Sequence, residues 1–411
     1  MLILIDIGST VVKVAEIDNN LKKQDFYDRD YDVEIYNQIS SIINDYKSKY
    51  KRPNFRICSS AKGGLRVGIV CLTERFSGNL TRNLALAAGA NINFVEVIDH
   101  KEKNILPPVD ALIVVGGIDC PDVKKMKEKL NNFDTGRYKF QILLYAGNKY
   151  LAKEFKRRYK QAIIVKNPIS SNLSLCNEDI LHKVRDFYLD DLIEKEGVVK
   201  LQKFSEIPVW PTPAIVNLAF ERISHSKSKL QFTAPFIIID IGGSTTDIHF
   251  GLELVKTDRD NRLSNYHPFN RYVFTELGVF TSRESTIERL SINKRLYEFF
   301  RMLYGEKASR KYADFRNGVM DEDMLFYACF FLALDSVYQR EGEKDIPLLD
   351  IEKIKSVVIT GGASQKVKLE KLSRIVKLFL KNPSGKKIKL FLDKNYEIWM
   401  EGMKYFPKRN A

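Results

Sequence analysis

FIIIDIGGST (Phe236–Thr245) is a second version of LILIDIGST (Leu2–Thr10), and this repeat decides how the chain is organised. Each copy has four apolar residues, an aspartate, an apolar residue and a turn of glycine and small hydroxyl residues, and a second apolar run follows. The pattern predicts two strands joined by a tight glycine turn in each copy. Two copies about half a chain apart indicate a duplicated architecture.

The composition of both turns suits a phosphate group. Glycine lets backbone N–H groups approach an anion closely, and small hydroxyl residues add further donors. Asp6 and Asp240 hold matching places at the ends of the first strands, where a carboxylate can hold Mg²⁺ through its water molecules. Two such hairpins that face each other would clamp the phosphates of a nucleotide between two domains.

A third element lies late in the chain. VVITGGASQK (Val357–Lys366) reads as a buried strand, a Gly-Gly turn and the start of a helix. The order of two hairpins and a late Gly-Gly turn resembles the actin, Hsp70 and sugar-kinase superfamily of ATPases. The resemblance implies an α/β, two-domain actin-like ATPase fold of duplicated ribonuclease-H-like domains, in which the late turn lies against the adenosine.

The resemblance also implies roles for individual residues. One phosphate site would be formed by Asp6, Gly8, Ser9, Thr10 and Lys13, and the other by Asp240, Gly242, Gly243, Ser244, Thr245 and Asp247. The nucleotide, ATP or ADP, would lie against Gly361 and Gly362. Asp6 and Asp240 would hold Mg²⁺ through water. Asp119, in the turn GGID (Gly116–Asp119), could orient the attacking water. An aspartate that caps the next helix explains the same residue equally well.

Length and pattern predict two large domains. A single core rarely exceeds roughly 250–300 residues, and the chain has 411. We expect a first ATPase domain at 1–230 and a second at 231–411, with a polar boundary at Ser224–Pro235. From about 55 to 170, short apolar strands alternate with helical segments, which predicts an additional α/β segment with a mostly parallel sheet covered on both faces.

Composition argues against several classes of protein. The longest apolar run, Met324–Tyr338, is too short to span a membrane and reads as a buried helix. The five cysteines form no CxxC pair, which favours free thiols and a cytoplasmic protein. The net charge of +14 is compatible with an acidic partner, but basic residues occur throughout the chain, with the densest stretches at Glu154–Lys160 and Ser384–Lys389. A general compositional bias is the simpler interpretation, and no nucleic-acid signature is present.

Several further motifs narrow the superfamily. They run in order through the first part of the chain: SSAKGGL, a helix ending in AGA, LIVVGGID, LLYAGN, WPTPAIV, DIGGSTTDIH and ELGV. This series resembles the MutL-type accessory proteins of cobalamin-dependent glutamate mutase, which are unrelated to the mismatch-repair protein of the same name. The resemblance covers residues 1–285 and weakens beyond them, and the stretch DNNLKKQDFYDRDYD departs from the family pattern.

The family resemblance implies a chaperone-like reactivating factor. Such a factor would use ATP to open an inactivated mutase and release damaged cobalamin, with the α/β segment as a source of partner contacts and a small second subunit as a possible further component. Three other classes stay open: a small-molecule kinase, an actin-like filament-forming ATPase and a nucleotide-gated activator of a radical enzyme. The lack of closely spaced cysteine pairs argues against an iron–sulfur cluster in the last class.

Overall fold

The computed structural model describes residues 1–60, 65–87, 90–98, 106–169, 179–180, 183–184, 186–187, 198–255, 269–321, 323–338, 349–362, 364, 367–380 and 388–406. Residues 61–64 of the SSAKGGL motif lie outside these residues. The chain divides into two compact units. Unit 1 comprises Met1–Gly63, Lys195–Lys256 and Pro268–Ala411, and unit 2 comprises Gly64–Glu194 and Thr257–His267.

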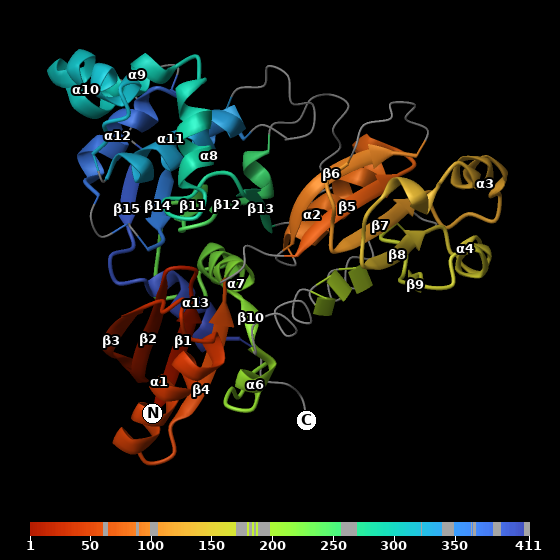
Figure 1. Ribbon diagram of the computed structural model, residues 1–411, viewed down its shortest axis with the longest axis horizontal. Coiled ribbons are helices and arrows are strands. Elements are labelled where there is room, and N and C mark those ends of the chain that lie inside the picture. The colour runs from red at the N-terminus through yellow and green to blue at the C-terminus, as the bar shows by residue number, and fades with distance from the viewer. Residues whose placement is uncertain are drawn as a thin grey trace. The chain divides into compact units, whose positions relative to one another are not determined.

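The first repeat forms the β1–β2 hairpin inside a five-stranded sheet of unit 1 (Figure 1). Its strands are β1 (Leu2–Ile7), β2 (Val11–Asp18), β3 (Asn20–Asp28), β4 (Asn54–Ser59) and β10 (Trp210–Pro211). Their order is β10-β4-β1-β2-β3. The β1–β2 and β2–β3 pairs are antiparallel, whereas β4 runs parallel to both β1 and β10. Thus β4, which falls inside the segment expected to be separate, completes the sheet of the first hairpin.

The second repeat forms a sheet with the same topology. Its strands are β11 (Phe236–Ile241), β12 (Thr246–Gly251), β13 (Phe269–Phe274), β14 (Ser356–Thr360) and β15 (Lys389–Leu392). Their order, β13-β12-β11-β14-β15, and their directions match those of the first sheet strand for strand. The duplicated α/β, actin-like fold is therefore confirmed. Both sheets belong to unit 1, and the expected division into separate domains at residue 230 stays a prediction.

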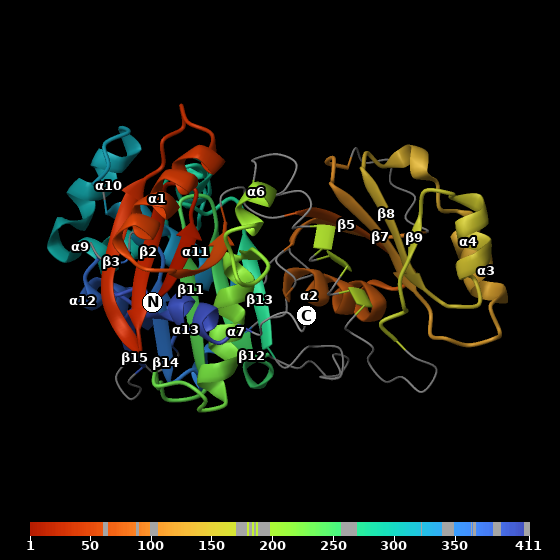
Figure 2. The same cartoon turned by 90° about the horizontal axis from the view of Figure 1, so that it is seen from below.

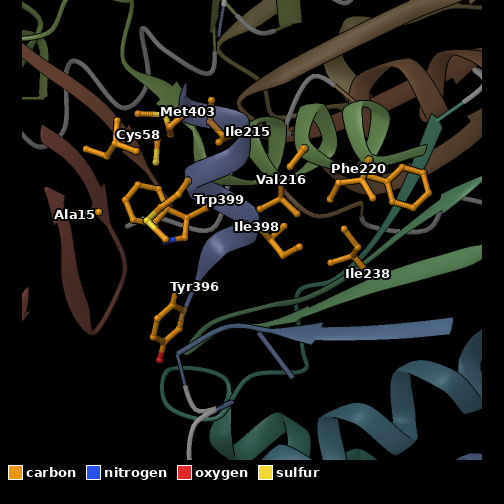
Figure 3. Close-up of a cluster of buried hydrophobic side chains, with 14 of the residues drawn as sticks. Ala15, Cys58, Ile215, Val216, Phe220, Ile238, Tyr396, Ile398, Trp399 and Met403 are labelled. Atoms are coloured by element: carbon orange, nitrogen blue, oxygen red, sulfur yellow. The ribbon is translucent and has the colours of Figure 1, made fainter. Parts of the chain in front are cut away.

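The two halves of unit 1 are joined by a pair of equivalent helices. α7 (Thr212–Ser224) follows β10, and α13 (Glu397–Lys404) follows β15. A Cβ added to Gly402 would lie 2.1 Å from the backbone oxygen of Ile215, so only glycine allows this helix approach. Figure 3 shows side chains of both helices in one apolar cluster with Ala15 and Cys58 of the first sheet and Ile238 of the second.

The described part of unit 1 has seven further α-helices. They are α1 (Ile35–Lys49), α6 (Val198–Gln202), α8 (Arg283–Ser291), α9 (Leu296–Tyr304), α10 (Ala308–Arg316), α11 (Met324–Tyr338) and α12 (Leu369–Lys377). α11 is buried along almost its whole length, as its apolar sequence predicts. Among the described residues, no helix has both the length and the apolar character needed to cross a membrane.

Unit 2 is built on a fully parallel sheet. Its strands are β5 (Arg66–Cys71), β6 (Asn91–Val97), β7 (Ala111–Gly116), β8 (Ile142–Gly147) and β9 (Ile163–Ile164), in the order β6-β5-β7-β8-β9. α2 (Asn79–Ala87) packs on one face, and α3 (Lys124–Asn131) and α4 (Ala152–Arg158) pack on the other (Figure 2). The expected parallel sheet with helices on both faces is confirmed.

Candidate functional site

The two hairpins and the late Gly-Gly turn of unit 1 line one cleft of about 610 Å³. Every residue proposed from the sequence except Asp119 contributes to its lining: Asp6, Gly8, Ser9, Thr10, Lys13, Asp240, Gly242, Gly243, Ser244, Thr245, Asp247, Gly361 and Gly362. These residues come from three separated stretches of the chain. They meet because β1, β11 and β14 end at the same place in the duplicated fold.

Asp119 lies in unit 2, in the loop after β7. Its Oδ1 accepts hydrogen bonds from the backbone N–H of Lys149 at 2.9 Å and from Nδ2 of Asn167 at 3.2 Å. These bonds tie together the loops that follow β7, β8 and β9. The expected role of Asp119 in orienting water stays a prediction.

Both hairpins close with the same backbone hydrogen bond. The N–H of Gly8 donates to the oxygen of Val11 at 3.1 Å, and the N–H of Gly242 donates to the oxygen of Thr245 at 2.8 Å. The hairpins also touch each other, because a Cβ on Gly243 would lie 2.9 Å from Oγ of Ser9. Glycine at position 243 therefore allows the close approach of the two turns.

The carboxylate of Asp6 is held on both of its oxygens. Oδ2 forms an ion pair with Nζ of Lys13 at 2.8 Å, directly across the β1–β2 pair. Oδ1 accepts hydrogen bonds from Oγ1 of Thr212 at 2.5 Å and Sγ of Cys58 at 3.5 Å. Burial, and then the charge of Asp6, raise the pKa of the Cys58 thiol well above its usual range, so the thiol stays protonated and can donate.

Lys13 is a cation fixed between the two halves of unit 1. Burial alone would lower its pKa, but the charges of Asp6 and Asp240 outweigh burial, and the pKa is raised above its ordinary value. Its Nζ also lies 5.1 Å from the ring centroid of Tyr396, which precedes α13. Lys13 thus carries a positive charge at the base of the cleft at every physiological pH.

The second hairpin has a different set of charges. Asp247 stands directly across from Asp240 and is paired with Arg271, whose Nη2 lies 2.9 Å from its Oδ1. The carboxylate of Asp240 has no hydrogen-bond or ion-pair partner among the described residues. Burial, followed by the negative charge of Asp247, raises the pKa of Asp240 to about 7. Asp240 is therefore the carboxylate in the cleft that is available to a cation.

The third turn follows β14 and requires glycine at one position. Gly361 has a φ of +107°, and a Cβ there would lie 2.1 Å from the backbone oxygen of Ile241. Gly362 has open space where its Cβ would be, and its oxygen accepts a hydrogen bond of 2.9 Å from the hydroxyl of Tyr396. The turn is thus held against both the second hairpin and the residue that covers Lys13.

The cleft is also lined by four residues that the sequence patterns do not predict as part of the site: Val11, Ser60, Thr212 and Pro213. Thr212 and Pro213 begin α7 and belong to the WPTP motif, to which the sequence alone assigns no function. The hydroxyl of Thr212 reaches Asp6 across 206 positions of sequence, which no local pattern reveals. The WPTP motif is the sequence signal for these two residues, but only the folded structure shows that they line the cleft.

The cleft combines the features that a polyanion needs. Two turns of small residues present backbone N–H groups, Lys13 supplies a fixed positive charge, and Asp240 can hold a hydrated cation. The described residues contain no group of three or more His, Cys, Asp or Glu side chains suited to hold a metal by themselves. This donor set fits a magnesium ion that keeps its waters and is shared with phosphate oxygens.

Comparison with known proteins gives a family. A family model described as "MutL protein" matches residues 2–403, which is nearly the whole chain. The Protein MutL of Clostridium tetanomorphum is 26% identical over 267 residues. That match covers 60% of this chain and 57% of the relative, so it spans little more than half of the relative's length.

Solved structures give more distant similarities. The activator of the 2-hydroxyisocaproyl-CoA dehydratase from Clostridium difficile, with bound ADPNP, is 10% identical, with a TM-score of 0.31 and coverage of 98% of this chain and 92% of that one. A putative N-acetylmannosamine kinase from Listeria monocytogenes is 9% identical, with a TM-score of 0.32 and coverage of 98% and 97%. The family assignment rests on the family model, and the fold rests on the topology of the two sheets.

Proposed function

The chain belongs to the MutL protein family, and from this premise we propose that it is an ATP-hydrolysing, chaperone-like reactivating factor for an adenosylcobalamin-dependent mutase of the glutamate mutase type. One observation carries the nucleotide part of the proposal. Both hairpins and the Gly361–Gly362 turn, which are far apart in sequence, line a single cleft. The mutase part follows from the resemblance of the ordered motifs to the glutamate mutase accessory family.

In this proposal the two turns hold the phosphates of ATP or ADP. Gly8 and Gly242 leave room for the backbone to approach an anion, and Ser9, Thr10, Ser244 and Thr245 add hydroxyl donors. Lys13 balances the charge of the phosphates. Gly361 and Gly362, which follow the strand next to β11, would contact the adenosine.

Asp240 is the residue that would hold Mg²⁺, through water. Its pKa is raised by burial and then by the negative charge of Asp247, and a divalent cation would relieve the repulsion between the two carboxylates. When bound, the cation would neutralise charge on the phosphate oxygens. Asp6 is already bound by Lys13 and Thr212, so its part is to hold the lysine in place.

Coupling to the partner follows from the contact between the hairpins. Gly243 touches Ser9, so a terminal phosphate placed between the turns changes how the two sheets of unit 1 approach each other. A nucleotide that favours one arrangement shifts the population toward it, and a partner that binds only that arrangement responds to the nucleotide state. We propose that unit 2 supplies the surface that contacts the partner.

A reactivation assay tests this function. Glutamate mutase loaded with hydroxocobalamin is mixed with the chain, ATP and Mg²⁺, and the release of cobalamin and the rate of ATP hydrolysis are recorded. We expect ATP to release cobalamin, the mutase to stimulate hydrolysis, and adenosylcobalamin to restore mutase activity. ADP in place of ATP, and the variant Asp240→Asn, are the controls and should give no release.

The same samples separate the alternatives. Unstimulated hydrolysis with no release of cobalamin would contradict the reactivating role. ATP-dependent sedimentation of the chain alone would instead indicate a filament, and phosphoryl transfer to a metabolite would indicate a kinase.

A further inference from the structure

We propose that the outer face of α3 and α4 in unit 2 is a docking surface for an acidic protein surface, and that this acidic surface belongs to the mutase. The proposal rests on the proposed function, because that function supplies the partner. Residues 122–162 contain 12 lysines and arginines but only 4 aspartates and glutamates, which is a net charge of +8. The net charge of all 411 residues is +14. More than half of the net charge therefore comes from about a tenth of the chain.

The positive charge lies on one side of the sheet. α3 and α4 lie side by side on the same face of the parallel sheet of unit 2 (Figures 1 and 2). Seven exposed basic side chains lie on the two helices themselves: Lys124, Lys125, Lys127, Lys153, Lys156, Arg157 and Arg158. Charges that are close together on one face create a local field that can attract an oppositely charged partner.

The stability of α3 does not explain its lysines. Lys124 and Lys125 occupy the first turn, where positive charge opposes the helix dipole, and the turn has no acidic residue and no side-chain cap. Lys125 and Lys129 are four residues apart and repel each other. The helix dipole therefore does not account for the two lysines of the first turn, whereas an interaction outside the helix does.

Several of these cations are available to a partner. Within the described part of the chain, Lys124, Lys125, Lys153 and Arg157 form no ion pair or hydrogen bond through their side chains. Lys127, by contrast, is paired with Glu154 at 2.9 Å and joins the two helices. The available cations therefore lie on the same two helices as the Lys127–Glu154 ion pair that joins them.

A small apolar groove between the helices favours a protein over a nucleic acid. The groove has a volume of about 310 Å³, and Leu130, Leu151, Phe155 and Tyr159 supply its apolar lining. Lys127, Glu154 and Arg158 also border the groove, so charges of both signs surround it. An apolar pocket surrounded by charge is the usual organisation of a protein interface, where a side chain of the partner fills the pocket.

Charge reversal in the full-length chain tests the surface. The variant Lys124→Glu/Lys125→Glu/Lys153→Glu places carboxylates in the first turns of α3 and α4, where they favour the helix dipole, so the fold should be kept. The matched control is Arg301→Glu/Lys307→Glu/Arg310→Glu, an equal charge change on exposed residues of unit 1. Glutamate mutase is the probe, and the Kd and the mutase-stimulated ATP hydrolysis are measured at low and high salt.

We expect the unit 2 variant to bind the mutase at least about tenfold more weakly at low salt, with a smaller salt dependence and unchanged basal ATP hydrolysis. The control should bind as the native chain does. Equal weakening in both variants, or none in the unit 2 variant while the native chain binds, would overturn the docking surface and leave the proposed function standing. A native chain that neither binds the mutase nor responds to it would overturn both. Loss of binding to a 20-base-pair DNA with mutase binding intact would assign the face to nucleic acid and overturn the proposal.

Discussion

Asp6 and Asp240 occupy the same position in two copies of one sheet, but the residue across the hairpin differs. Lys13 faces Asp6, whereas Asp247 faces Asp240. The first carboxylate is consequently neutralised by a lysine that also points at the cleft. The second is buried beside another carboxylate, and burial followed by that charge raises its pKa to about 7. One backbone therefore presents a fixed cation on one side of the cleft and an open carboxylate on the other.

The fourth strand of each copy shows a second difference. Asp6 pairs with Cys58 in β4, and Asp240 pairs with Thr360 in β14. The next residues along the chain, Ser59 and Gly361, are therefore counterparts. Ser59 lies in β4, and the N–H of the following Ser60 donates to Ile7 at 2.9 Å. Gly361 instead turns at a positive φ against Ile241. Duplication thus preserves the sheet, and single positions adapt the two ends of the cleft to different contacts.

The largest expected effect on stability comes from Lys13→Met. The substitution leaves the buried carboxylate of Asp6 without its ion pair, and breaking such a pair costs about 3–5 kcal/mol. Urea unfolding at pH 7 measures the loss. The double variant Asp6→Asn/Lys13→Met removes both charges and should regain most of it. A single variant as stable as the native chain would show that Asp6 is not held by Lys13.

Two alanine variants, Gly361→Ala and Gly362→Ala, test the difference between the Gly361 turn and its counterpart at Ser59. Alanine at 361 requires a positive φ and collides with the oxygen of Ile241, which should cost roughly 2–4 kcal/mol. Alanine at 362 meets nothing within 4 Å and should leave the free energy of unfolding unchanged. Calorimetric titration with ADP should still show weaker binding for Gly362→Ala if this turn contacts the nucleotide. Equal stability of the two variants would contradict the geometry of the turn.

A smaller effect concerns the dependence of stability on pH. The pKa of Asp240 is raised from 3.8 to about 7, so the folded protein binds more protons than the unfolded chain between these values, and this residue lowers stability as pH rises through them. Asp240→Asn removes the buried charge. We expect the variant to be more stable than the native chain at pH 8, by an amount that grows as pH rises from 4 to 8, and to show no gain near pH 4. A gain that is independent of pH would contradict the assignment.

The sequence predicted the parts of the site that lie within single hairpins. The spacing of Asp6 from Gly8 and of Asp240 from Gly242 placed each turn correctly, because a hairpin is set by local residues. The contacts of Asp6 with Thr212 and of Lys13 with Tyr396 could not be predicted, since each joins residues that only the packing of α7 and α13 brings together. The strand β4 was also not separable by pattern from those of unit 2, because all of them are short apolar runs.

The central claim is that the cleft between the two hairpins holds Mg²⁺ and nucleotide through the open carboxylate of Asp240. ATP hydrolysis by Asp240→Asn, with folding checked by circular dichroism, tests it most directly. We expect hydrolysis to fall by at least about a hundredfold, because the cation would lose its protein contact beside the phosphates. A folded Asp240→Asn variant that hydrolyses ATP at the native rate would contradict the claim.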